Sequence, residues 1–166
     1  METIGIIGAG NIGGAVARGL VKQGGWKASR VIISRRKDHL LEPWQQEGYS
    51  CTTVNREVVE KSEVVLLAVL PGQAKEVAEE IAPALAGKPR LLLSAVAAVS
   101  AEELEEWTGH QVPVVRVMPN IAIEFGESMT CLAGRDPEAV NLAEEIFAPV
   151  GSTMIIQEKL MPAATI

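Results

Sequence analysis

A glycine-rich segment near the start of the chain restricts the fold more than any other feature of the sequence. The residues Gly8-Ala9-Gly10-Asn11-Ile12-Gly13 fit the pattern G-x-G-x-x-G, and they lie between the apolar run Thr3–Ile7 and the helical pattern Asn11–Lys22. In this position the pattern predicts a strand, a tight turn and a helix whose first N–H groups bind a pyrophosphate.

Each glycine of this segment has an expected role. Gly8 permits the tight turn, Gly10 lets the phosphates approach the backbone, and Gly13 lets the helix pack on the strand. The alternative is a glycine-rich turn that binds nothing. We favour the phosphate loop because the pattern both follows a strand and opens a helix.

Short apolar runs alternate with helical patterns along the rest of the chain. This alternation is typical of βαβ units, and it predicts a Rossmann-type, doubly wound α/β fold with a mainly parallel sheet and helices on both faces. We expect Ser100 and Glu103 to form a capping box, and Asn55 to cap another helix. The expected strands are Thr3–Ile7, Arg30–Ser34, Tyr49–Thr53, Val64–Val69, Arg90–Ser94, Pro113–Val117, Met129–Ala133 and Thr153–Gln157, and the further helices are Asp38–Gln46, Asn55–Ser62, Gln73–Leu85, Ala101–Trp107 and Pro137–Phe147.

The composition and charge exclude several classes of protein. Of the 166 residues, 48% are hydrophobic, which is enough for one buried core. No apolar stretch approaches the roughly 20 residues needed to cross a bilayer. The formal charge of −6 argues against a nucleic-acid-binding surface. We therefore expect a cytoplasmic protein with no membrane or nucleic-acid partner.

The cysteines and histidines show no pattern of metal ligands. Cys51 and Cys131 lie far apart, with no CxxC pair and no neighbouring histidine. We interpret both as small buried hydrophobic residues in a reducing compartment, and we expect no metal site. His39 and His110 are expected at the surface.

The chain shows no internal linker, so we assign residues 1–157 to one cofactor-binding domain. Residues 158–166 have the pattern of a helix that begins here and leads into a further domain. Leu160, Met161, Ala163 and Ile166 are apolar, and we expect this tail either to fray or to be buried against another copy of the chain.

The end of the second expected strand indicates which dinucleotide is bound. An NAD site places Asp or Glu there to accept from the ribose 2′-OH. This chain has Ser34-Arg35-Arg36-Lys37 instead, and Ser and Arg can donate to a 2′-phosphate that a carboxylate would repel. The sequence therefore predicts NADPH, with a solvated basic loop as the alternative.

Two further strand ends are expected at the same edge of the sheet. Ala68-Val69-Leu70-Pro71 follows the fourth strand, and Ser94-Ala95-Val96-Ala97 follows the fifth. Because ligands of open α/β sheets lie outside the carboxyl ends of the strands, these small residues should flank the ribose and nicotinamide. They could equally be plain turns.

A second pattern, more specific than the glycine loop, runs through the whole chain. Its segments are Gly8–Gly13, Asn55 ahead of a short acidic helix, Leu67-Ala68-Val69-Leu70-Pro71, Leu93-Ser94-Ala95-Val96-Ala97, Arg116-Val117-Met118-Pro119-Asn120 and a tail from Gly151 to Met161. In this order and spacing they resemble the pyrroline-5-carboxylate reductases.

The resemblance implies NADPH-dependent reduction of a small imino acid, 1-pyrroline-5-carboxylate, to L-proline. It also implies a set of cofactor-binding residues in three groups. Gly8, Gly10, Asn11, Ile12 and Gly13 would hold the pyrophosphate; Ser34, Arg35 and Asn55 would lie along the adenosine half; Ala68, Val69, Ala95 and Ala97 would line the ribose and nicotinamide, with Asn120 nearby. The strand-end segments add Arg36 and Pro71 to the expected cofactor-binding residues.

The chain differs from this family at three places. Leu70 precedes Pro71 where the family usually has Lys, and Ile121-Ala122 follows Asn120 where the family usually has Thr-Pro. In the family a helical domain follows, which supplies the dimer interface, most of the imino-acid pocket and the proposed proton donor. The resemblance thus implies a homo-oligomer, and we assign no catalytic acid within these residues.

Two other functions are consistent with the same domain. One is a stand-alone NADP(H)-binding module or sensor, and the other is a different reductase of the β-hydroxyacid-dehydrogenase-like group. A helical continuation with a Ser-Gly-Ser-Gly-Pro-like stretch would favour imine reduction over the second.

Overall fold

One eight-stranded sheet organises the computed structural model, which describes residues 2–164. The strand order is β3-β2-β1-β4-β5-β6-β7-β8, and only β6 and β7 run antiparallel to each other. This mainly parallel sheet confirms the doubly wound α/β fold. The strands are β1 (Ile4–Ile7), β2 (Val31–Ser34), β3 (Ser50–Thr52), β4 (Val64–Leu67), β5 (Leu91–Ser94), β6 (Val114–Met118), β7 (Ser128–Gly134) and β8 (Gly151–Ile155).

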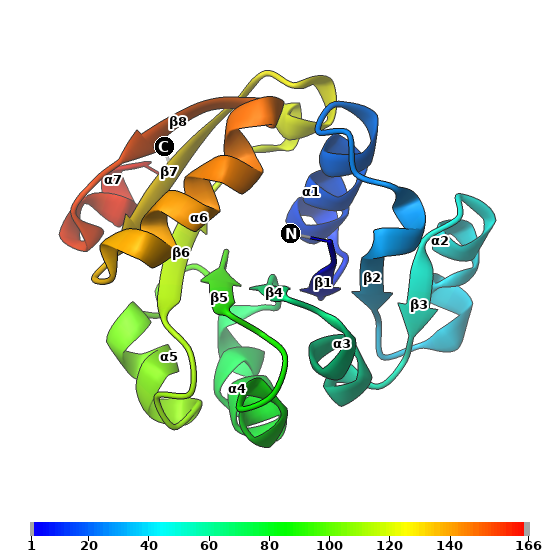
Figure 1. Cartoon of the computed structure of the whole chain (residues 1–166), viewed down its shortest axis with the longest axis horizontal. Helices are drawn as coiled ribbons and strands as arrows, with labels where there is room; N and C mark the ends of the chain where they lie inside the picture. The colour runs from blue at the N-terminus through cyan, green and yellow to red at the C-terminus, as the bar shows by residue number, and fades with distance from the viewer. Residues whose placement is uncertain (1, 165–166) are drawn as a thin grey trace.

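Helices cover both faces of the sheet (Figure 1). On one face lie α1 (Asn11–Lys22) and α6 (Pro137–Phe147). On the other lie α3 (Asn55–Lys61), α4 (Pro71–Leu85) and α5 (Ala101–Trp107). The short helices α2 (Glu42–Gln46) and α7 (Met161–Ala164) lie beside β3 and β7.

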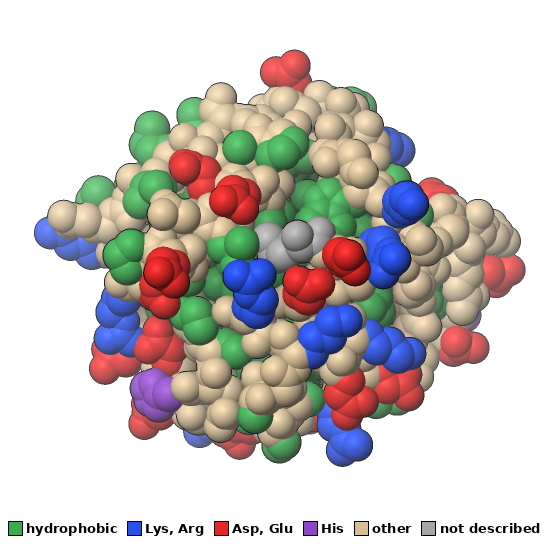
Figure 2. All heavy atoms as spheres, viewed as in Figure 1, with side chains coloured by type: hydrophobic (Ala, Val, Ile, Leu, Met, Phe, Trp, Pro, Cys, Tyr) green, Lys and Arg blue, Asp and Glu red, His purple; other side chains and the backbone are tan. Residues whose placement is uncertain are grey.

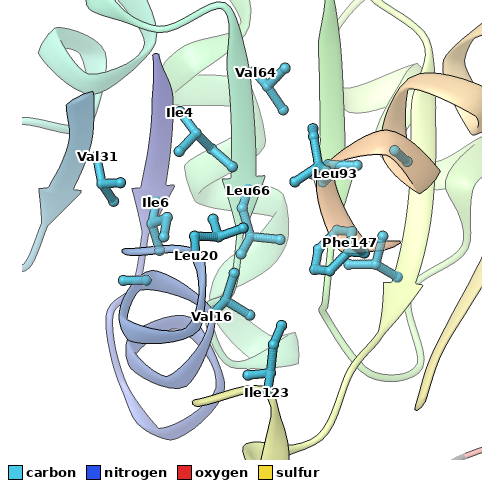
Figure 3. Packing of buried hydrophobic residues seen from close by; sticks show 14 of the residues in the cluster. Ile4, Ile6, Val16, Leu20, Val31, Val64, Leu66, Leu93, Ile123 and Phe147 are labelled. Atoms are coloured by element: carbon cyan, nitrogen blue, oxygen red, sulfur yellow. The ribbon is translucent and has the colours of Figure 1, made fainter. Parts of the chain in front are cut away.

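The two faces of the sheet have separate hydrophobic cores. Ile6 of β1 and Leu66 of β4 pack with Val16 and Leu20 of α1 (Figure 3), and each fully buried side chain of this size contributes roughly 1.5–3 kcal/mol. All residues of β4 are buried, which explains why this central strand is apolar throughout instead of alternating.

Helix α1 is held near both ends by close packing on glycines that the sequence patterns did not predict. Near its C-terminus it contacts a 3-10 turn over Ile121–Phe125. A Cβ at Gly19 would lie 2.5 Å from the carbonyl oxygen of Ile123, so only glycine lets these backbones approach. Near its N-terminus, a Cβ at Gly14 would lie 3.1 Å from the Trp44 ring.

Most predicted boundaries are shifted by one or two residues, as for α4, which begins at Pro71 instead of Gln73, and three predicted elements differ in a way that can be explained. The expected helix Asp38–Gln46 is a 3-10 turn over Asp38–Leu40 followed by α2, because Pro43 lacks an N–H and is tolerated only in the first turn of a helix. The expected strand Val64–Val69 ends at Leu67, since α4 begins at Pro71. The expected strand Thr153–Gln157 starts at Gly151 instead, where it pairs with β7.

The exposure of the two histidines agrees with the prediction, whereas that of the two cysteines does not. His39 and His110 are exposed as predicted. Cys51 and Cys131 are free thiols that are only partly buried, so the prediction that both are buried is wrong. Acidic and basic side chains are interspersed on the face shown in Figure 2. Among residues 2–164, no helix is long and apolar enough to cross a membrane.

The tail after β8 is packed on its own domain. Met161 is fully buried, whereas Leu160 remains half-exposed. The expectation that this tail frays or requires another copy of the chain is therefore wrong for Met161, whose burial comes from the contact of α7 with β7. Ile166, which belongs to the same expectation, lies outside the described residues.

The chain contains one tyrosine, Tyr49, and it is buried under α1. Its hydroxyl donates to the carbonyl oxygen of Ala17 at 3.4 Å, and its ring meets the Trp44 ring edge-on at 5.1 Å. Burial is the main cause that raises the pKa of Tyr49 to about 12, and the charge of Glu47 adds to it.

We expect the phenol of Tyr49 to titrate near pH 12 instead of near 10 in the folded chain. Because the folded pKa lies above the unfolded one, the stability that the neutral phenol provides is complete below pH 10 and is lost as the pH rises toward 12. The phenolate absorption band, followed during alkaline titration, measures this directly. Titration near 10 with the near-ultraviolet circular dichroism still native would contradict the burial of Tyr49.

Candidate functional site

The turn between β1 and α1 depends on glycine at two positions. Gly8 has a positive φ of +91°, and a Cβ there would lie 2.6 Å from the carbonyl oxygen of Ala68. A Cβ at Gly13 would lie 2.3 Å from the carbonyl oxygen of Gly8. Because real Cβ atoms do not approach backbone oxygen so closely, the fold itself requires both glycines.

Gly10 differs from its two neighbours because the fold leaves it free. A Cβ at Gly10 would meet no atom within 4 Å. Gly10 is the N-cap of α1, and it provides no side chain to accept from the first N–H groups of the helix. The first turn also carries no acidic residue. The structure therefore presents free backbone donors and open space at one point, which is the arrangement that binds an anion.

Backbone hydrogen bonds place the ends of four strands in a row beside this turn. The N–H of Gly8 donates to the carbonyl oxygen of Ser34 at 3.4 Å. Across β1 and β4 the N–H of Ala68 donates to Ile7, and across β4 and β5 the N–H of Ala95 donates to Leu67, both at 2.9 Å. The predicted site segments after β1, β2, β4 and β5 thus meet at the carboxyl edge of the sheet.

The basic end of β2 is tied to the glycine turn. The guanidinium of Arg35 donates from Nη1 to the carbonyl oxygen of Ala9 at 2.6 Å, which places a positive charge next to the start of α1. Arg36 and Lys37 follow and are exposed. This strand end has no acidic residue, so no carboxylate there would repel an anionic group of a ligand.

Ser34 and Asn55 form a pair whose arrangement differs from expectation. Ser34 is buried, and its hydroxyl donates to Oδ1 of Asn55 at 2.7 Å. Asn55 was expected to cap α3, but the N-cap is Val54, which has no side-chain cap, because the Asn55 amide turns toward β2. Asn55 accepts at Oδ1, which leaves its NH2 group as the donor of the pair.

The segments predicted to flank the ribose and nicotinamide follow β4 and β5 as expected, and their contact with a cofactor stays a prediction. Ala68 and Val69 follow β4, and Ala95 and Ala97 follow β5. Pro71 is the first residue of α4, and Leu70 before it is 68% exposed. Asn120, at the end of β6, accepts at Oδ1 from the N–H of Ala122, so this side chain caps the 3-10 turn that packs on α1. The proximity of Asn120 to a cofactor remains a prediction.

Two site features were not found by sequence patterns. One is the carbonyl of Ala9, because a backbone acceptor has no signature in a sequence. The other is an ion pair between Arg116 and Glu158, which are far apart along the chain. Among the described residues no group of three or more His, Cys, Asp or Glu could hold a metal ion.

We expect Gly13→Ala to lower the free energy of unfolding by about 1–3 kcal/mol, because its Cβ has no room against Gly8. Gly10→Ala should change it by less than about 1 kcal/mol, the size of an N-cap effect, because its Cβ meets nothing. Urea unfolding of the two variants and the parent chain measures both values. Equal losses would show that Gly10 is also required by the fold.

Comparison with known proteins agrees with this arrangement. The family model described as "NADP oxidoreductase coenzyme F420-dependent" matches residues 3–98, which include the glycine turn, the basic strand end and the ends of β4 and β5. The match therefore covers the row of strand ends described above.

Similar whole proteins are named pyrroline-5-carboxylate reductases, which confirms the resemblance. Pyrroline-5-carboxylate reductase 1 of Dictyostelium discoideum is 30% identical over 176 residues, covering 98% of this chain and 32% of that protein. Reductase 2 of the same organism is 31% identical over 184 residues, covering 98% of this chain and 60% of that protein.

The fold agreement extends to a solved structure. The crystal structure of Plasmodium falciparum pyrroline carboxylate reductase with NADP bound matches with a TM-score of 0.87 at 26% identity, covering 99% of this chain and 62% of that one. The chain spans between about a third and three-fifths of the length of these relatives. Because the family model covers more than half of the chain, this chain belongs to the family of NADP oxidoreductases described as coenzyme F420-dependent.

Proposed function

We propose that this chain is the NADPH-binding part of a reductase that converts 1-pyrroline-5-carboxylate to L-proline. One observation carries the cofactor assignment: the space in front of Gly10 is open while Gly8 and Gly13 are closed by backbone. In a turn that binds no ligand, a larger residue would fit at Gly10, because its Cβ would meet no other atom of the fold. The names of the relatives, and the NADP bound in one of them, support the choice of cofactor and reaction.

The residues at the carboxyl edge suit the two phosphate-bearing parts of NADPH. The backbone N–H groups that begin α1, from Asn11 to Gly13, are placed to bind the pyrophosphate next to Gly10. Arg35, Arg36 and the NH2 group of Asn55 provide donors for the 2′-phosphate. Ser34 would support Asn55, since its hydroxyl proton is already used in the pair.

The far end of the row suits the nicotinamide. When bound there, NADPH supplies the hydride that reduces the imine carbon. Ala68, Ala95 and Ala97 have small apolar side chains, so the ring could lie close to the backbone and away from water. We place the proton donor and most of the imino-acid pocket outside residues 1–157, in the part of the longer relatives that this chain does not match.

The proposal also includes the cellular location and the oligomeric state of the enzyme. We propose a cytoplasmic, homo-oligomeric enzyme in which residues 1–157 form the cofactor domain. The two free thiols are consistent with a reducing compartment.

The family description favours one second candidate. Its mention of coenzyme F420 suggests hydride exchange between NADP and a deazaflavin instead of an imine. Both reactions need the same NADP site, so only the second substrate distinguishes them.

We expect Arg35→Ala to weaken NADPH binding by about 1.5–3 kcal/mol, the value of a hydrogen bond to a charged group, and NADH binding by little. Isothermal titration calorimetry with both cofactors measures the difference. Lys27→Ala is the matched control, because Lys27 is an exposed cation next to the opposite end of β2. An equal loss for both cofactors would show that Arg35 acts only through its bond to Ala9.

The substrate is tested with the longest form of the protein that its gene encodes. We expect oxidation of NADPH in the presence of 1-pyrroline-5-carboxylate, and no transfer to the oxidised deazaflavin. Gly10→Val should abolish the rate while leaving the fold intact, since its side chain fills the space for the phosphates. Turnover with the deazaflavin alone would contradict imine reduction but retain the cofactor site.

A further inference from the structure

The carboxylate of Glu158 joins three separate parts of the chain. It lies in the 3-10 turn Glu158–Leu160 that follows β8. Its Oε1 accepts from the backbone N–H of Ala101, the first residue of α5, at 2.7 Å. The same oxygen accepts from Nη1 of Arg116 on β6 at 3.4 Å. One side chain of the tail is thus bonded to α5, which follows the segment between β5 and α5, and to β6, where Arg116 is the register partner of Ser94 at the end of β5.

That segment, residues 95–100, forms the nicotinamide end of the row of strand ends. Its first residue is bonded to Leu67 at the end of β4, and it also contains Ala97. Ala98 has a φ of +60°, in the left-handed region that alanine rarely adopts. A backbone held in this conformation needs support from its surroundings.

Val96 and Val99 anchor this segment in the hydrophobic core, whereas Ala97 and Ala98 face a space that no side chain fills. This cavity has a volume of about 610 Å³, and Ala97, Ala98, Met118 and Met161 are among the residues that line it. Glu158 and Arg116 also line this cavity. Within the described residues, the bonds of Glu158 therefore bridge an open space that side chains do not fill.

The short bond to Ala101 and the burial of Arg116 stabilise this bridge. The side chain of Arg116 is only 10% exposed, so loss of the carboxylate would leave its charge buried without its partner. Ser100 and Glu103 already form the capping box at the start of α5. The bond from Ala101 to Glu158 satisfies a further N–H of that first turn.

We propose that Glu158 is a positioning residue for the nicotinamide end of the cofactor. It holds residues 95–100 in place through Ala101 and Arg116, and it makes no contact with the adenosine half of the site. This inference rests on the proposed binding of NADPH, and it adds to it a residue from the tail that follows the sheet.

The test compares two ligands on variants of the chain. NADPH contacts the whole row of strand ends, whereas adenosine 2′,5′-bisphosphate lacks the nicotinamide and contacts only the adenosine half. We expect Glu158→Ala to raise the Kd of NADPH about tenfold and that of the bisphosphate by less than about twofold. The fluorescence of bound NADPH, which reports on the nicotinamide, should shift toward that of the free cofactor.

Matched variants separate positioning from folding. Lys159→Ala changes the next residue, which lines the same cavity and has an exposed side chain, and it should leave both affinities unchanged. Glu158→Gln keeps an acceptor for Ala101 but loses the charge that faces Arg116, so we expect an intermediate effect. If Glu158→Ala does not fold, as judged by circular dichroism, Glu158→Gln carries the comparison.

The outcomes are distinct. An unchanged NADPH affinity with native fluorescence in both Glu158 variants overturns the inference alone. Equal loss for both ligands also overturns it, because Glu158 would then act only on the fold. If the parent chain binds neither ligand, the proposed function itself fails, and the inference fails with it.

Discussion

The β1–α1 turn packs on its neighbours through direct contact between backbone atoms. At Gly8 and Gly13 the missing side chains let carbonyl oxygens approach where a Cβ would collide, at 2.6 and 2.3 Å. This close packing places the first turn of α1 directly above the carboxyl end of β1. The rest of the candidate site depends on it, because a turn even slightly wider would move the free N–H groups away from the row of strand ends.

The charge of the site follows from the same placement. Because β2 lies beside β1 in parallel register, its end delivers Arg35 next to the turn, where the guanidinium bonds to the carbonyl of Ala9. This bond links the part of the site that suits a pyrophosphate to the part that suits a 2′-phosphate. Asn55 joins from the start of α3 because the buried hydroxyl of Ser34 donates to it. Two elements remote in sequence thus present donors to one region.

The opposite end of the row is supported in a different way. Beyond β5 the sheet continues through β6 and the reversed strand β7, and the tail after β8 returns to pack on them. Glu158 then bonds to Ala101 and Arg116 beside a cavity, so polar contacts add to the core packing of Val96 and Val99 there. The glycine turn is thus fixed by close backbone contacts, whereas the segment after β5 is bordered by an ion pair and a helix cap.

Local chemistry explains why much of this molecule can be predicted from its sequence. Periodicity and β-branched runs predicted the βαβ order, the helices Asn11–Lys22 and Pro137–Phe147 to the residue, and the capping box of Ser100 and Glu103, because these depend on neighbours along the chain. The G-x-G-x-x-G pattern predicted the tight turn that opens α1 for the same reason. Tertiary contacts decided the rest. The side-chain amide of Asn55 bonds to Ser34, which leaves α3 without its expected cap. Pro43 divides an expected helix, and Met161 of the tail is buried within its own domain. The bonds of Arg35 to Ala9 and of Glu158 to Arg116 join residues whose spacing along the chain carries no signal, so only the folded backbone brings them together.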